Sequence, residues 1–122
     1  MTLNPVVFAE VQGENGATLR QFYTDLFGWA FEEMQGGMDY GMAPPGKGGI
    51  GVGAGSAPEG RTGMVTFYVR TNDVEAALGA AERLGGTIAM PRTEMPDGTV
   101  IGLFEDPEGH TIGLVTPTDG DG

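Results

Sequence analysis

The chain has 122 residues, the length of one domain with a single modest core. Its 17 acidic and 6 basic residues give a formal charge of -11, which disfavours nucleic acid and anionic membrane surfaces because both repel negative charge. Cysteine is absent, so disulfides, thiolate metal sites and thiol nucleophiles are excluded. Without an apolar run of spanning length or a signal-like N-terminus, we expect a cytoplasmic protein.

The first half begins with an apolar, β-branched segment at residues 5–11 that predicts a strand. A helix follows, with Asn15 as its N-cap and Gly28 at its end. The helical period is carried by a stripe of apolar residues: Leu19, Phe22, Tyr23, Leu26 and Phe27. Three short segments predict an antiparallel meander: residues 29–34, 38–43 and 48–55.

The second half repeats this order. Residues 63–71 predict a strand, and a helix begins at Asn72 or Asp73. Its packed side is expected to hold Val74, Leu78, Ala81 and Leu84. Three more strands are predicted, with tight turns between them: residues 87–92, 99–106 and 110–117. We therefore predict an α+β fold in which residues 1–122 form one domain of two βαβββ modules, at about 4–55 and 63–117.

The duplicated order, together with "FYTDLFGW" and "FEDPEGHTIGLV", resembles the vicinal oxygen chelate superfamily from Val6 to Thr116. That superfamily includes glyoxalases, extradiol dioxygenases and bleomycin resistance proteins. The resemblance implies an open, curved sheet around a central cavity that takes a small-molecule ligand, commonly in a homodimer. In the metalloenzymes of the superfamily, four side chains on the cavity face hold a divalent ion.

The resemblance places those four ligands at Phe8, Gly51, Met64 and Gly113. Phenylalanine and glycine have no donor atom, and a thioether is a poor ligand for a hard divalent ion. At Gly51 and Met64, a slip of two residues brings in no histidine or glutamate. We therefore predict no bound metal and no other cofactor, with an all-carboxylate site as the open alternative. The one histidine, His110, is predicted to be a structural residue beside the "DPEG" turn.

Strand alternation predicts which side chains line the cavity. In the first strand these are Phe8, Glu10 and Gln12, and in the first strand of the second module they are Met64, Thr66 and Tyr68. Val65, Phe67 and Val69 should then face the second helix. Glu10 is the candidate general base or acid, and the Tyr68 hydroxyl is the candidate group that orients a substrate carbonyl. In the alternative reading, Glu10 bonds to backbone or to Tyr68 and only supports the sheet.

Three further features bear on a ligand. Tyr40 rather than Asp39 is expected to line the cleft, and Arg92 is expected in a loop at its mouth, where it would meet an anionic group. Glycines at every second position leave one strand face without side chains, with room for a bulky ligand or a partner backbone: Gly49, Gly51 and Gly53.

Three functions follow as hypotheses. The first is a metal-independent binding protein of the bleomycin-resistance type, whose acidic surface favours a cationic or aromatic small molecule. The second is a metal-free isomerase, cyclase or lyase that uses Glu10 and Tyr68 for proton transfer. The third is a divalent-metal glyoxalase or dioxygenase. Elemental analysis separates the third from the others, and turnover separates the second from the first.

Overall fold

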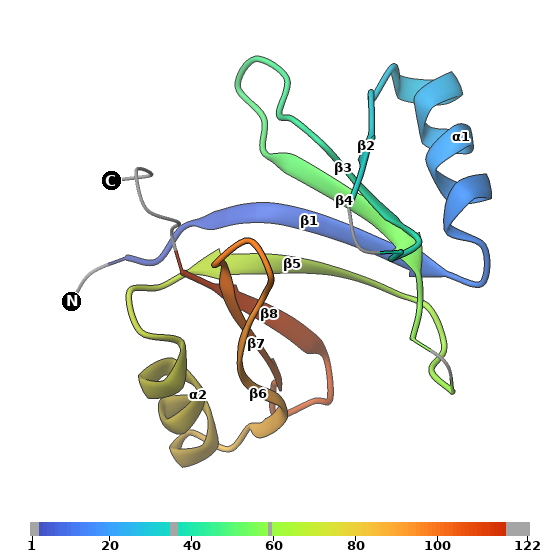
Figure 1. Cartoon of the computed structure of the whole chain (residues 1–122). Coiled ribbons are helices and arrows are strands. Elements are labelled where there is room, and N and C mark those ends of the chain that lie inside the picture. The colour runs from blue at the N-terminus through green and yellow to red at the C-terminus, as the bar shows by residue number, and fades with distance from the viewer. Residues whose placement is uncertain (1–2, 35–36, 59, 117–122) are drawn as a thin grey trace. The chain divides into compact units, whose positions relative to one another are not determined.

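The computed structural model describes residues 3–34, 37–58 and 60–116, so the predicted end of the second module at residue 117 lies outside the described residues. The chain divides into two compact units. One is Phe8–Thr66, and the other comprises Val7 and the residues before it together with Phe67 and the residues after it. Each unit carries one helix beside four strands (Figure 1). The α+β class and the repeated βαβββ order are confirmed.

The first module consists of β1 (Val6–Gly13), α1 (Gly16–Phe27), β2 (Glu32–Glu33), β3 (Tyr40–Ala43) and β4 (Gly51–Ser56). Its strands lie in the order β2-β3-β4-β1, with β1 and β4 parallel and the other neighbours antiparallel. The predicted strand at 29–34 shrinks to two residues. At the start of the predicted segment, the Trp29 ring packs on Phe27 and Tyr23 of α1 at centroid distances of 4.9 and 5.5 Å.

Both predicted ends of α1 are confirmed. Asn15 Oδ1 accepts a hydrogen bond from the Thr18 amide at 3.0 Å, and Gly28 ends the helix in the left-handed conformation with φ 77°. Three members of the apolar stripe are exposed: Phe22, Leu26 and Phe27. Arg20 is buried instead, because its guanidinium bonds to the sheet beneath the helix.

The second module consists of β5 (Met64–Arg70), α2 (Val74–Arg83), β6 (Thr87–Glu94), β7 (Val100–Glu105) and β8 (Thr111–Val115). Its strands lie in the order β5-β8-β7-β6, and only β5 and β8 are parallel. Asp73 is the N-cap of α2, and its carboxylate accepts from the Ala76 amide at 3.0 Å. The core is formed by Val74, Leu78 and Leu114.

Three predictions in the second module are wrong. Leu84 is 80% exposed because it is the C-cap of α2 and lies past its last turn. Of the three β5 side chains expected to face α2, Val69 packs against the core that includes Val74 and Leu78, but Val65 and Phe67 are exposed. Arg92 lies in strand β6 and not in a loop, because pairing with β7 continues to Glu94.

The "DPEG" turn is confirmed between β7 and β8. Gly109 has a φ of 90°, and its amide donates to the Asp106 carbonyl at 2.9 Å. His110 pairs with the same turn, since its Nδ1 lies 3.0 Å from Asp106 Oδ2. Within the described residues, neither helix is long and apolar enough to cross a membrane.

Candidate functional site

Glu10 is a buried carboxylate in the middle of β1, with 5% of the residue exposed. Its Oε2 accepts a hydrogen bond from Tyr40 Oη at 2.8 Å, and its Oε1 accepts one from Gln12 Nε2 at 3.1 Å. Hydrogen bonds to a carboxylate are stronger than those between neutral groups. The structure therefore brings together three predicted site residues, and the donor from across the sheet is Tyr40.

Glycines in β4 make room for the rings around Glu10. Gly53 is the register partner of Glu10, and a Cβ at Gly53 would overlap Tyr40 Oη and lie 2.9 Å from Phe8 Cζ. A Cβ at Gly51 would lie 3.2 Å from Phe8 Cδ1. Gly51 and Gly53 therefore leave one face of β4 without side chains, as predicted. The space beside them is filled by the rings of Phe8 and Tyr40, not by a ligand or a partner backbone. Gly49 lies outside this arrangement, since its Cβ would approach only the Gly46 backbone.

Asp39 and Tyr40 point to opposite sides of β3, as predicted from alternation. Asp39 Oδ1 accepts from Arg20 Nη2 at 2.8 Å, and its Oδ2 accepts from the Ser56 hydroxyl. The Ser56 hydroxyl, followed by the Arg20 guanidinium, holds the pKa of the Asp39 carboxyl below its usual value. Sequence reasoning missed Arg20, and the available signal was a charged residue between Leu19 and Tyr23 on the apolar stripe of α1.

The remaining candidate residues lie on the second module or at its start. Tyr68 is buried and covers Gly113, its register partner, where a Cβ would lie 2.5 Å from Tyr68 Cε2. Thr66 is buried and Met64 is half-buried, both on β5. Arg92 is exposed on β6. The catalytic pairing of Glu10 with Tyr68 stays a prediction.

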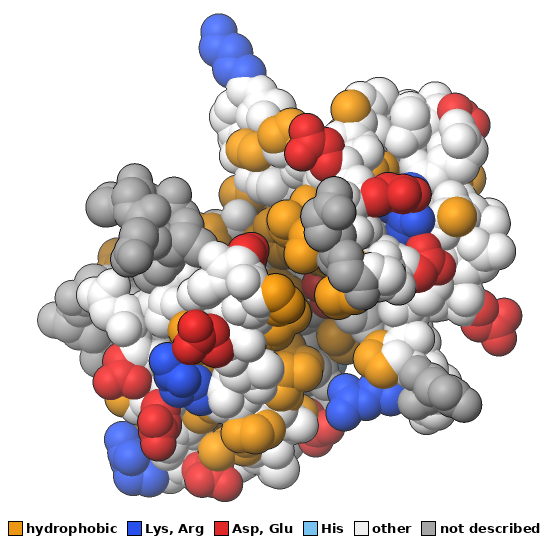
Figure 2. All heavy atoms as spheres, viewed as in Figure 1, with side chains coloured by type: hydrophobic (Ala, Val, Ile, Leu, Met, Phe, Trp, Pro, Cys, Tyr) orange, Lys and Arg blue, Asp and Glu red, His pale blue; other side chains and the backbone are white. Residues whose placement is uncertain are grey.

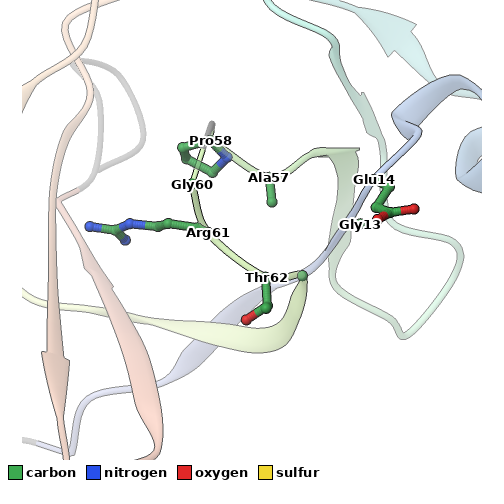
Figure 3. Close-up of a pocket in the computed structure, with 8 residues that line it drawn as sticks. Gly13, Glu14, Ala57, Pro58, Gly60, Arg61 and Thr62 are labelled. Carbon is green, nitrogen blue, oxygen red and sulfur yellow. The ribbon is translucent and has the colours of Figure 1, made fainter.

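A surface hollow of about 480 Å³ lies where β4 leads into β5. It is lined by Gly13, Glu14, Ala57, Pro58, Gly60, Arg61, Thr62 and Gly63. The Arg61 side chain extends away from its centre (Figure 3). None of the predicted site residues lines this hollow, so we place the candidate site at Glu10.

The helix caps allow the two modules to be matched. Counted back from Asn15 and Asp73, Phe8 corresponds to Thr66 rather than Met64. The register pairs Glu10 with Gly53 and Tyr68 with Gly113, so Gly113 corresponds to Gly53 rather than Gly51. Met64 and Gly51, which were chosen from sequence, therefore lie two residues from the positions that correspond to Phe8 and Gly113.

Neither set of positions fits a divalent ion. The corrected set offers a phenyl ring, two glycines and one threonine hydroxyl, whereas a metal site requires about three or four His, carboxylate or thiolate ligands. Both glycine positions are covered by tyrosine rings, from Tyr40 and Tyr68. Within residues 3–34, 37–58 and 60–116, no three His, Asp or Glu side chains are grouped so that they could hold a metal ion.

Comparison with known proteins gives a family and a fold. The model of the Glyoxalase/Bleomycin resistance protein/Dioxygenase superfamily matches residues 6–114. The chain is 28% identical over 123 residues to "Putative glyoxylase CFP32" of Mycobacterium bovis, and equally to the Mycobacterium tuberculosis protein of that name. The match covers 88% of this chain but only 43% of the relative, so the chain spans less than half of that protein's length.

Solved structures share the fold at low sequence identity. A member of the same superfamily from Vibrio splendidus 12B01 has a TM-score of 0.64 at 14% identity, covering 94% of this chain and all of the other. A methylmalonyl-CoA epimerase in complex with methylmalonyl-CoA has a TM-score of 0.63 at 15% identity, with 97% of each chain covered. A Bacillus halodurans C-125 protein described as hypothetical reaches 0.71 at 10% identity, again with 97% of each chain covered.

Proposed function

Because the chain belongs to the Glyoxalase/Bleomycin resistance protein/Dioxygenase superfamily, we propose that it is a metal-independent binding protein for a small cationic, partly aromatic molecule. The observation that carries this proposal is the buried Glu10 carboxylate, held by Tyr40 and Gln12 between aromatic rings. A carboxylate recognises a ligand cation. Phe8, Gly53 and Gly113 have no side-chain donor atom for a metal ion, so in this proposal Glu10 is the group that recognises the ligand.

The residues around Glu10 favour a cationic ligand that also carries an apolar group. The half-buried residues Phe8 and Tyr40 lie beside Gly53, the register partner of Glu10, and aromatic ring faces attract ammonium and guanidinium groups. The formal charge of -11 adds a long-range attraction. On the face shown in Figure 2 the carboxylates are spread out rather than gathered in one patch, so they raise the local cation concentration without defining the site.

Benzylamine, which is protonated at pH 7, and benzyl alcohol are matched probes that differ in charge. We expect calorimetry to show binding of benzylammonium with a stoichiometry of about one, weaker binding of benzyl alcohol, and no change after EDTA treatment. Glu10→Gln should weaken benzylammonium binding by about tenfold or more, since it removes the charge from the recognition group.

Glu32→Gln is the control, because it makes the same change of net charge at an exposed position on β2. Equal losses for the two variants would assign the effect to net charge and contradict a site at Glu10. Binding that disappears with EDTA and returns with a divalent ion would contradict metal independence.

A metal-free isomerase, cyclase or lyase is the second candidate. The 2.8 Å bond between Tyr40 Oη and Glu10 favours it, because a carboxylate beside a phenol is a suitable pair for moving a proton to and from a substrate. In this version Tyr40 joins Glu10, and Tyr68 keeps the predicted role of orienting a carbonyl. Mass spectrometry of bound ligand incubated in D2O tests it, since proton abstraction exchanges hydrogen for deuterium.

We also propose a homodimer in the cytoplasm that binds neither nucleic acid nor membrane. Multi-angle light scattering of the purified protein tests the dimer, and a single mass near 12.7 kDa at micromolar concentration would contradict it.

A further inference from the structure

Asp39, the residue before Tyr40, is held by both its side chain and its backbone. Arg20 Nη2 donates to Oδ1 at 2.8 Å, the Ser56 hydroxyl donates to Oδ2, and the Ser56 amide donates to the Asp39 carbonyl at 2.8 Å. The Ser56 hydroxyl also accepts from the Gly16 amide at 2.9 Å, at the start of α1. The first residues of β3 are therefore tied to α1 and to β4.

Arg20 reaches both neighbours of Tyr40. It is 8% exposed, and its Nη1 donates to the Ala54 carbonyl at 3.1 Å, which fixes the guanidinium on the sheet. Besides its bond to Asp39, it packs against Gly41, where a Cβ would lie 2.8 Å from Arg20 Cδ. Glu33 is a weaker partner at 3.5 Å from Nη2, with most of its side chain in solvent.

We infer that Arg20 is a positioning residue for the Glu10 site, acting from the helix side of the sheet through Asp39. The expected effect on ligand binding rests on the proposed function, whereas the expected effect on the orientation of Tyr40 does not. The Tyr40 ring lies over Gly53 and Gly55, which have no side chains to confine it on β4. We infer that the direction of the ring depends on the backbone at residues 39–41, because Arg20 bonds to Asp39 and packs against Gly41.

The test uses 3-fluorotyrosine, because the chain has only three tyrosines and Tyr40→Phe assigns one fluorine resonance. The solvent isotope shift between H2O and D2O reports how far Tyr40 meets water. Arg20→Met removes the guanidinium but keeps an apolar stem, Arg20→Lys keeps the charge, and Asp39→Asn removes the anchor. Asp73→Ala removes the cap of α2 in the second module and is the control for general destabilisation.

We expect Arg20→Met and Asp39→Asn to raise the Tyr40 isotope shift at least twofold and to weaken benzylammonium binding by about tenfold, as for one lost charge-assisted hydrogen bond. Arg20→Lys should lie between these variants and the unsubstituted protein, and Asp73→Ala should leave the resonance in place.

A folded Arg20→Met with an unchanged Tyr40 resonance overturns the inference. If Arg20→Met fails to fold, Asp39→Asn decides, because Asp39 is partly exposed and its substitution leaves Arg20 bonded to Ala54. A moved resonance in a protein that never binds benzylammonium supports the positioning role and contradicts the proposed ligand.

Discussion

Gly53→Ala tests whether Tyr40 can reach Glu10 only because position 53 in β4 has no side chain. The new Cβ would overlap Tyr40 Oη and lie 2.5 Å from its Cζ, so the ring must leave Glu10. Loss of a hydrogen bond to a buried carboxylate costs about 1–3 kcal/mol, and overpacking costs about 1–3 kcal/mol more. A gain of about 0.4–1 kcal/mol comes from the stiffer unfolded chain. We expect the free energy of unfolding to fall by about 1–6 kcal/mol.

Urea denaturation measures this loss, and a double-mutant cycle with Tyr40→Ala isolates its cause. In the Tyr40→Ala background the main obstacle is gone, so the coupling between the two substitutions should be about 1–3 kcal/mol. Gly46→Ala is the matched control: its Cβ would meet nothing within 4 Å, and we expect a change within about 0.5 kcal/mol. A Gly53→Ala protein as stable as Gly46→Ala, with no coupling to Tyr40, would refute the reasoning.

Two further predictions concern the same strands. Tyr40→Phe keeps the ring but removes the donor to Glu10 Oε2, and should lower the free energy of unfolding in urea by about 1–3 kcal/mol. Tyr23→Phe, on half-buried Tyr23 of α1, should change it by less than about 0.5 kcal/mol. The hydrogen bond from Ser56, followed by the one from Arg20, lowers the pKa of Asp39 in the folded protein. The ionised carboxylate therefore stabilises the folded state above the ordinary pKa near 3.8, and this stabilisation is lost as the pH falls through the lower pKa of the folded state. The excess stability of the unsubstituted protein over Asp39→Asn should therefore be constant from pH 7 to about 5 and disappear towards pH 2, as followed by thermal unfolding. An excess that persists at pH 2 would contradict this assignment.

Local signals predicted the elements well because the chemistry of a helix end is local. Asn15 and Asp73 each bond to an amide three residues ahead, and Gly28 adopts the conformation that glycine favours. Arg92 was misplaced because the end of a strand depends on its partner, and β7 pairs with β6 as far as Glu94. No pattern within residues 87–98 contains that information.

The site was predicted in part. Alternation correctly placed Glu10 and Gln12 on one face and put Tyr40 opposite Asp39. It did not reveal that Tyr40 donates to Glu10, because a contact across a sheet depends on which strands are neighbours and in what register. The recurring glycines Gly49, Gly51 and Gly53 were predicted to leave room for a ligand or a partner backbone, because a missing side chain indicates space but not which group fills it.

The two modules show why the carboxylate lies where it does. Glu10 and Tyr68 occupy matching positions, and each is paired in register with a glycine, Gly53 or Gly113. In the second module the tyrosine covers its own glycine. A glutamate has no ring to cover Gly53, so the neighbouring strand supplies Tyr40, whose hydroxyl then reaches the carboxylate. Both glycines are covered by a tyrosine ring, but the ring over Gly53 comes from β3 and its hydroxyl donates to Glu10, which is why we place the proposed recognition group at Glu10.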